Sequence, residues 1–224
     1  MRILMISDIH ANLPALLTLE SEIEVADLTL VGGDLIGYYC DVNEVIAFVI
    51  RHGLTCVRGN HDHFLLHGVP DRVQPHVKWA LAYAERVITP DHRVYLASLP
   101  LIWGQVVDGR RILLTHGSPW CPIDEYLYED TNKRDALREF NVDIIAFGQT
   151  HRPWLDTTTR PVLINLGSVG QSRHRPGIVC CSVYDTVTNE VEQSERQYDF
   201  SGVMEKALAE GADAWIHRFM SEDT

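Results

Sequence analysis

Residues 2–10 read RILMISDIH, an apolar run that ends abruptly in polar side chains. Four consecutive apolar residues of this kind predict a buried strand over Ile3–Ile6, with Ser7 and Asp8 at its carboxyl end. Two further apolar runs with the same design are Leu28–Val31, followed by Gly32-Gly33-Asp34, and Thr55–Val57, followed by Arg58-Gly59-Asn60. We therefore predict three short strands, each of which delivers a polar side chain where it ends.

Segments with a helical pattern separate these strands. Leu13–Ile23 has a proline near its start, and Asn43–His52 is closed by Gly53, a favourable residue just after a helix end. Strands that alternate with helices are typical of an α/β protein with a parallel sheet. We therefore expect the fold to be α/β.

The remaining sequence continues the domain without a linker or repeat. Residues 64–100 are predicted to form a helical excursion, and from residue 105 the pattern returns to strands. The helices expected there are Gln74–Ile88, Asp91–Leu99, Thr131–Phe140 and a segment from Val203, and the strands are Gln105–Val107, Arg111–Leu114, Asp143–Phe147, Val162–Asn165, Gly177–Tyr184 and Glu190–Arg196. A single domain over residues 1–224 is the simplest organisation.

The amino-acid composition restricts the classes of binding partner and the cellular compartment that we expect. The formal net charge of −12 argues against duplex nucleic acid and against anionic membranes as partners. Five cysteines, an odd number with no CxxC pair, argue against a disulfide framework and a cysteine zinc site, and reduced cysteines suit the cytoplasm. The apolar run at the N-terminus is too short for a signal peptide, and no later run reaches the length of a membrane span. We therefore expect a cytoplasmic protein.

Chemically active side chains gather at the predicted strand ends. Asp8 and His10 follow the first strand, and a spacing of two places both on one side of an extended chain. Ligands collect at the carboxyl ends of strands in open α/β sheets, so these side chains should converge. The full set is Asp8, His10, Asp34, Asn60, His61, His116, Gln149 and His151.

This mixture of carboxylate, imidazole and amide groups indicates a metal centre. Mixed oxygen and nitrogen ligands suit Mn, Fe, Zn, Co or Ni better than Ca, which prefers oxygen throughout. The set is too large for one tetrahedral zinc and fits two divalent metals that share a bridging carboxylate. Taken singly, an Asp-x-His or a Gly-Asp pair is usually a cap or a turn. The ordered series of such pairs at strand ends is what favours a metal site.

Five sequence blocks resemble those of the calcineurin-like metallophosphoesterases. The blocks are Asp8-Ile9-His10, Gly33-Asp34-Leu35-Ile36-Gly37, Gly59-Asn60-His61-Asp62, His116-Gly117 and Gly148-Gln149-Thr150-His151. Residues 165–171, NLGSVGQ, are similar to a motif of the small single-domain phosphodiesterases of bacteria and archaea. The resemblance spans about residues 3–184.

The resemblance implies a four-layer α/β/β/α sandwich of two mixed sheets flanked by helices. It also implies that a phosphate ester, a diester or a monoester, is hydrolysed by attack of a metal-bound hydroxide. The implied ligands are Asp8, His10, Asp34 and His151 for the first metal, and Asp34, Asn60 and His116 for the second. His61 is implied to protonate the leaving group, with Asp62 orienting it.

One position departs from the family pattern. The family has Gly-His-x-His where this chain has Gln149, and an amide oxygen is a weaker donor than imidazole for these metals. We therefore expect the second ion to bind weakly, with partial occupancy. Arg173 and His174, in a local basic cluster, are candidates for contact with the substrate phosphate.

Three functions remain open on the sequence. The first is an enzyme that acts on a phosphorylated small molecule or a phosphoprotein. The second is a non-catalytic protein-interaction scaffold of the same fold, which the change at Gln149 alone favours. The third is a nuclease, which the acidic balance and the lack of a basic, aromatic-rich face disfavour. The oligomeric state also stays open, a homo-oligomer included.

Overall fold

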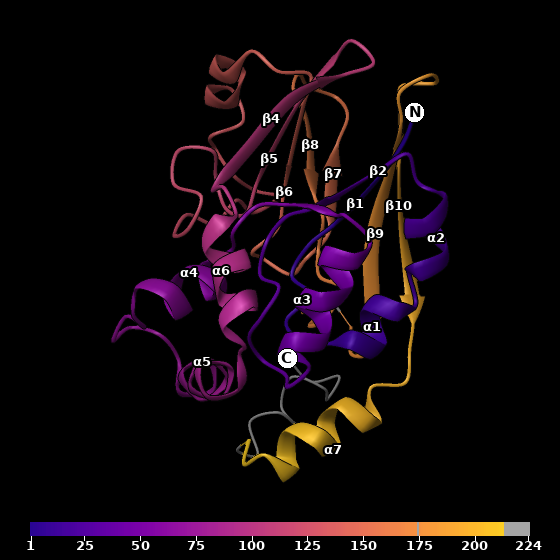
Figure 1. The fold of residues 1–224 in the computed structure, drawn as a ribbon. Helices are drawn as coiled ribbons and strands as arrows, with labels where there is room; N and C mark the ends of the chain where they lie inside the picture. The colour runs from indigo at the N-terminus through magenta and orange to yellow at the C-terminus, as the bar shows by residue number, and fades with distance from the viewer. Residues whose placement is uncertain (174, 213–224) are drawn as a thin grey trace.

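Two sheets of five strands pack face to face in the computed structural model, which describes residues 1–173 and 175–212 (Figure 1). Strand β1 (Arg2–Ile6) shows why the sheets stack. Ile3 and Met5 lie in the core between the sheets, whereas Leu4 and Ile6 lie in the core on the helical side, and all four are buried. A strand buried on both faces carries an uninterrupted apolar run, which explains the sequence pattern.

The first sheet has the order β10-β9-β1-β2-β3. Strands β2 (Leu28–Val31) and β3 (Thr55–Cys56) continue in parallel from β1, as the alternation of strands and helices predicts. Strands β9 (Ile178–Asp185) and β10 (Glu190–Gln197) add to the other edge in antiparallel register. The sheet is therefore mixed.

The second sheet has the order β4-β5-β6-β8-β7. Its parallel centre consists of β5 (Arg110–Thr115), β6 (Ile144–Phe147) and β8 (Val162–Asn165). The antiparallel edges are β4 (Ile102–Val107), which forms the predicted hairpin with β5, and β7 (Trp154–Asp156), which the sequence pattern missed because it has only three residues.

Helices cover the outer face of the first sheet. They are α1 (Leu13–Leu17), α2 (Glu20–Val25) and α3 (Val42–Arg51), and α7 (Ser201–Ala209) lies below them at the end of the sheet in Figure 1. The single helix predicted over Leu13–Ile23 is wrong, because the chain breaks after Leu17. There the Thr18 amide and hydroxyl both bond to the Ala15 carbonyl, which tightens the last turn and ends α1.

A second group of helices stands beside the sheets and forms the predicted excursion (Figure 1). It comprises α4 (Asn60–His67), α5 (Pro75–Val87) and α6 (Pro90–Ser98), hereafter the helical arm. The arm begins earlier than expected, since α4 starts at Asn60. Two proposed site residues, Asn60 and His61, therefore lie in the first turn of a helix.

The outer face of the second sheet is covered mainly by a loop. The helix predicted over Thr131–Phe140 is wrong, since the chain there forms only a 3₁₀ helix, η1 (Ala136–Phe140). Its Leu137 packs with Leu127 and Phe147 in a small separate core. Leu137 and Phe140 are three residues apart, the period of a 3₁₀ helix, and Asn141 ends the element with a φ of 49°. The two mixed sheets flanked by helices are otherwise as the resemblance implies.

The two sheets contact each other where β1 and β6 end. The Gln149 amide donates to Asp8 Oδ2 across 3.0 Å, and Ser7 Oγ donates to the same oxygen across 2.5 Å. Gly148 lies between them. A Cβ at this position would sit 2.8 Å from the Ser7 Cβ and closer still to Ser7 Oγ and Asp8 Oδ2. This seam has no room for a methyl group.

No helix among the described residues combines the length and the apolar content needed to cross a membrane.

We predict that Gly148→Ala lowers the free energy of unfolding by about 1–3 kcal/mol, the usual cost of overpacking. Gly104→Ala is the control, because a Cβ there meets its nearest atom, Leu113 Cδ1, at 3.5 Å. The control should change stability by less than about 0.5 kcal/mol. Urea unfolding of the two variants measures the difference, and equal stabilities would show that the seam can open without cost.

Candidate metal centre

Left-handed backbone turns deliver most of the proposed ligands. The φ angles are 56° at Asp8, 54° at His10, 55° at Asp34, 66° at Gln149 and 58° at His151. The expectation that a spacing of two works through extended chain is therefore wrong, although the side chains do meet. A left-handed turn at a residue with a Cβ costs about 1–2 kcal/mol, and such strain clusters at functional sites.

The first ligand group lies at the seam between the sheets. His10 Nε2 and His151 Nε2 are 3.0 Å apart, and Asp8 Oδ1 is 3.2 Å from the latter and 3.7 Å from the former. Asp34 Oδ2 is 3.7 Å from His10 Nε2. All four side chains are buried. The four groups implied as ligands of the first metal are thus gathered around one point.

The other ring nitrogen of each histidine fixes its tautomer. His10 Nδ1 faces the Ile36 carbonyl at 3.1 Å, and His151 Nδ1 faces the Gln171 carbonyl at 2.6 Å. A carbonyl oxygen only accepts, so Nδ1 carries the hydrogen and Nε2 presents a lone pair. Two lone pairs that face each other across 3.0 Å repel unless a cation lies between them. A divalent cation held by His10 and His151 would satisfy both lone pairs.

The second group repeats this arrangement on the other side of Asp34. His116 Nδ1 donates to the Gly32 carbonyl at 2.8 Å, which leaves His116 Nε2 as an acceptor. It faces Asn60 Oδ1, also an acceptor, at 2.8 Å. Asp34 Oδ2 is 3.5 Å from His116 Nε2, so one oxygen is close to an imidazole of each group. Asp34 is placed to bridge two ions.

Gln149 lies beside the second group, and a hydrogen bond to the backbone fixes its side-chain amide. Its Nε2 donates to the Ile123 carbonyl at 2.8 Å. Its Oε1 is buried next to Gly117, and no hydrogen-bond partner is found for it within residues 1–173 and 175–212. Asp8 Oδ1 and Asp34 Oδ2 are buried acceptors of the same kind. Buried acceptors without a donor are costly, and a bound cation would satisfy them.

The electrostatics of the centre favour a cation. Burial, followed by repulsion from Asp62 and Asp8, raises the pKa of Asp34 well above its usual value. Burial lowers the pKa of His10 to about 4, so its imidazole is neutral and can act as a ligand. The residues therefore fit divalent cations in donor type, in tautomer and in charge. Among the described residues, three groups of ligand atoms lie close enough together to hold an ion, namely Asp8–His10–His151, His10–Asp34–His61 and Asp8–Asp34–His116.

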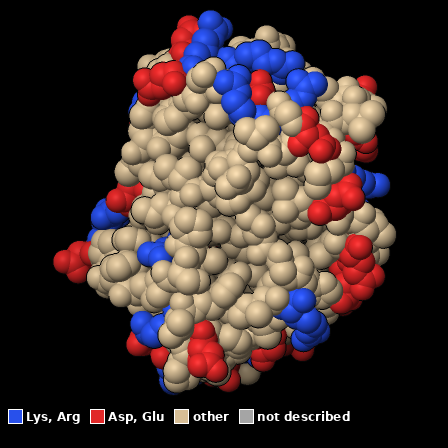
Figure 2. Space-filling model, turned by 45° about the horizontal axis from the view of Figure 1, so that its top comes forward, with Lys and Arg blue, Asp and Glu red and all other residues tan. Residues whose placement is uncertain are grey.

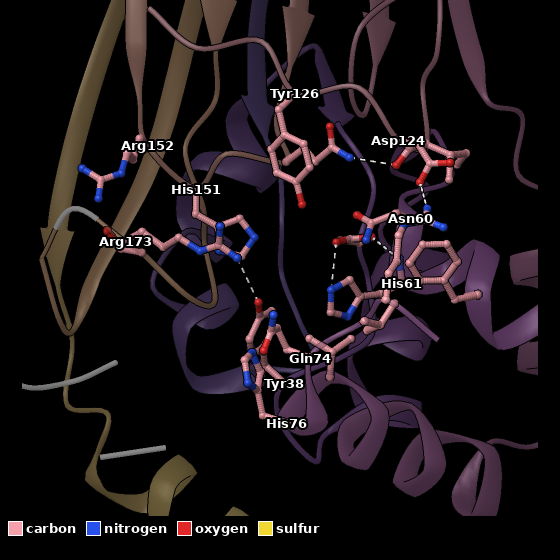
Figure 3. Close-up of a pocket in the computed structure, with 18 of the residues that line it drawn as sticks. Tyr38, Asn60, His61, Gln74, His76, Asp124, Tyr126, His151, Arg152 and Arg173 are labelled. Carbon is pink, nitrogen blue, oxygen red and sulfur yellow. Dashed lines mark hydrogen bonds and ion pairs between the residues drawn. The ribbon is translucent and has the colours of Figure 1, made fainter. Parts of the chain in front are cut away.

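His61 projects into the pocket (Figure 3), whereas the Asp62 side chain bonds to backbone amides. His61 Nε2 is 3.9 Å from Asp34 Oδ2, and burial with neighbouring imidazoles lowers the pKa of His61 well below its usual value. The Asp62 carboxylate accepts hydrogen bonds from the backbone amides of Leu35, Ile36 and Gly59. These bonds fix the turn from which α4 starts, and the predicted role of Asp62 in orienting His61 stays a prediction.

A pocket of about 530 Å³ opens over the centre, between the sheets and the helical arm (Figure 3). Arg173 lies in its wall and donates to the Tyr38 hydroxyl at 3.0 Å. His174, the other proposed substrate contact, lies outside the described residues. Tyr38 and Tyr126 also line the pocket, and neither belongs to the proposed site. Tyr38 directly follows the second sequence block, but a tyrosine after a glycine carries no distinctive pattern.

Comparison with known proteins agrees with this geometry. The family model of the calcineurin-like phosphoesterase superfamily domain matches residues 1–189. An uncharacterised protein of Methanocaldococcus jannaschii is 28% identical over 233 residues, which cover 96% of this chain and 95% of that protein.

Two solved structures are similar over nearly the whole chain. A metallophosphoesterase from Sphaerobacter thermophilus has a TM-score of 0.79 at 26% identity, covering 96% of this chain and 97% of that one. A hypothetical protein from Pyrococcus horikoshii has a TM-score of 0.85 at 19% identity, covering 98% of this chain and 97% of that one. The second likeness shows the fold alone.

We predict that Asp34→Asn removes metal from both groups, whereas Asn60→Ala removes it from the second group only. The substituted amide would keep an oxygen but lose the charge that one shared atom supplies to two ions. Elemental analysis of chelator-free protein after saturation with Mn measures the stoichiometry, with circular dichroism as a control for folding. Equal metal loss in the two variants would contradict the bridging role of Asp34.

Proposed function

The chain belongs to the calcineurin-like phosphoesterase superfamily, and on this premise we propose that it hydrolyses a phosphate ester with the help of two divalent cations. The observation that carries the proposal is the pair of facing acceptors on each side of Asp34. His10 and His151 meet at 3.0 Å, and Asn60 and His116 meet at 2.8 Å. Each pair needs a cation, and Asp34 Oδ2 is shared between them.

Bound cations would supply a nucleophile at neutral pH and positive charge for the phosphate oxygens. Two divalent ions and two aspartates give the centre a formal charge of about +2, by addition over neutral histidines. That local charge outweighs the protein's net charge of −12 at short range. Mn, Fe, Zn, Co and Ni all suit this donor set.

His61 is the proposed general acid. Hydrolysis forms one P–O bond from water and breaks the P–O bond to the leaving group, and the leaving oxygen must gain a proton. His61 faces the pocket and contacts Asp34 without belonging to either facing pair. Burial keeps its imidazole neutral in the empty pocket, and the negative charge of a bound phosphate acts in the opposite direction on its pKa.

The substrate is proposed to be a phosphorylated small molecule. The pocket volume of about 530 Å³ falls within the range of sites that enclose small ligands. A phosphoprotein substrate is less well supported, because its phosphorylated residue would have to pass between the helical arm and the sheets. The cytoplasmic location remains an expectation from the sequence.

Two other functions are less well supported. A scaffold without catalysis would not need the strained turns that bring Asp8, His10 and Asp34 together. On the face of the molecule drawn in Figure 2, some Lys and Arg side chains gather at the top among Asp and Glu, others are scattered along the edges beside acidic residues, and the broad centre carries few charges. That face offers duplex nucleic acid no continuous basic surface.

The proposed function is tested by metal removal and replacement. Protein stripped with a chelator should lose hydrolysis of every ester in a panel of phosphomonoesters and phosphodiesters. Addition of Mn, Co, Ni or Zn should restore it. Activity that survives in protein shown by elemental analysis to be free of metal would refute the proposal.

We predict that His61→Asn lowers kcat by about 10²–10⁴, the usual contribution of a general acid, while both metals stay bound. The asparagine keeps polarity but cannot carry the proton. Metal stoichiometry and kcat are measured on the same preparation. Loss of metal in proportion to activity would make His61 a ligand, as its place in the His10–Asp34–His61 group also allows.

We further predict that Gln149→His lowers the Mn concentration needed for half-maximal activity. An imidazole replaces the amide oxygen beside the second group, at the expense of the bond from Gln149 to the Ile123 carbonyl. Metal-activation curves for the two proteins provide the measurement. An unchanged curve, with two metals bound per unmodified chain, would show that the amide already serves the second ion fully.

A further inference from the structure

Arg173 differs from the other cations of the pocket. Arg72 pairs with Asp124, Arg175 pairs with Glu195, and Arg152 is exposed to solvent. Arg173 is partly buried, and its Nε is enclosed without a hydrogen-bond partner. Within the described ranges 1–173 and 175–212, no carboxylate pairs with its guanidinium. A largely enclosed guanidinium that forms no direct ion pair is well placed to bind an anion.

Tyr38 holds this guanidinium in place. Arg173 Nη2 donates to the Tyr38 hydroxyl at 3.0 Å, and the arginine reaches into the pocket beside His151 (Figure 3). The Tyr38 ring stacks on His61 with 5.2 Å between centroids and meets His10 edge-on at 4.5 Å. The hydroxyl that positions Arg173 is therefore fixed by the same imidazoles that form the centre.

The backbone of Tyr38 is strained to reach this position. Its φ is 58°, a left-handed value that is rare for a bulky side chain, and the residue is 2% exposed. Gly37 precedes it with a φ of 101°, and a Cβ there would collide with the His61 imidazole. Two successive left-handed residues bring Tyr38 over His61. Backbone strain of this kind persists where the surrounding structure stabilises it, and it is concentrated at functional sites.

The backbone of Arg173 contacts a residue of the centre. Its amide donates to the His151 carbonyl at 3.2 Å. Arg173 therefore lies on the side of the first ligand group. A phosphate that bound at the centre would lie within reach of its guanidinium.

We propose that Arg173, positioned by Tyr38, binds a non-bridging phosphate oxygen and thereby selects phosphomonoesters over phosphodiesters. This inference rests on the proposed function, because it names the class of ester that the centre takes.

The selectivity follows from the oxygens of the two esters. A monoester dianion has three charged non-bridging oxygens, whereas a diester has two, with a neutral ester group in place of the third. Bound cations attract the oxygens nearest to them, and Arg173 offers charge-assisted hydrogen bonds to one that faces the pocket wall. A diester would place its second ester group against the guanidinium and leave a buried charge unpaired, which acts against that substrate.

Ligand binding tests the proposal without turnover. Titration calorimetry on Mn-loaded protein compares inorganic phosphate, which resembles a monoester, with dimethyl phosphate, a slowly hydrolysed diester. Arg173→Gln should weaken phosphate binding by about tenfold or more and dimethyl phosphate binding by less than about twofold. Tyr38→Phe keeps the ring and loses the hydroxyl, so it should weaken phosphate binding by about three- to tenfold. Arg173→Lys, which keeps the charge, should restore part of the loss.

Arg175→Gln is the matched control, because it removes a neighbouring pocket cation that Glu195 already neutralises. It should change phosphate affinity by less than about twofold. Metal content must match the unmodified protein in every variant. Equal loss of affinity for both ligands in Arg173→Gln, or an effect of Arg175→Gln as large, would overturn the inference.

Kinetics provide a second readout. The ratio of kcat/KM for p-nitrophenyl phosphate to that for bis(p-nitrophenyl) phosphate should fall by about tenfold in Arg173→Gln, because only the monoester loses a partner. An unchanged ratio in an active variant overturns the inference and leaves the proposed function intact. If the unmodified metal-loaded protein hydrolyses neither ester, the proposed function fails, and the phosphate titrations still decide whether Arg173 binds the anion.

Discussion

The two oxygens of Asp34 act on different parts of the molecule. Oδ1 accepts the backbone amide of His61 at 2.8 Å, and Oδ2 faces His10 and His116. One carboxylate thus fixes the start of the helical arm and is shared by the two ligand groups. The glycine at position 59 follows from this, because any Cβ there would collide with the Asp34 side chain. Both ligand groups depend on this carboxylate staying buried and charged.

Burial of so many acceptors at one seam opposes folding in the absence of metal. Asp8 Oδ1, Asp34 Oδ2 and Gln149 Oε1 find no donor within the described part of the chain, and left-handed turns add backbone strain. Cations that bind only to the folded chain offset this cost and raise the free energy of unfolding. The same groups that make the empty centre unfavourable therefore make the loaded centre tight.

Much of this arrangement could be predicted from the sequence, and the failures have physical causes. Short apolar runs such as Ile3–Ile6 predicted strands correctly because a strand buried on both faces has few other solutions. The topology predicted correctly that Asp8 and His10 converge. The predicted extended backbone between them was wrong, because tertiary hydrogen bonds, such as that from the His10 amide to the Asp34 carbonyl, set the left-handed turns. The pairing of Arg173 with Tyr38 joins residues 135 apart, a distance over which sequence pattern carries no signal.

The two ligand groups are built on supports of different kinds. Asp8, His10 and His151 follow strands that lie in the centres of the sheets, whereas Asn60 is the first residue of α4. Helices α4 and α5 also contribute the pocket wall around Phe64 and Val77. An ion in the first group would thus be held mainly by the two sheets, whereas an ion in the second would be held partly by the helical arm, which also lines the pocket. A ligand that shifted the arm would act directly on the exchange rate of an ion in the second group, and on that of an ion in the first group only through the shared Asp34, so one ion of the centre would be the more responsive.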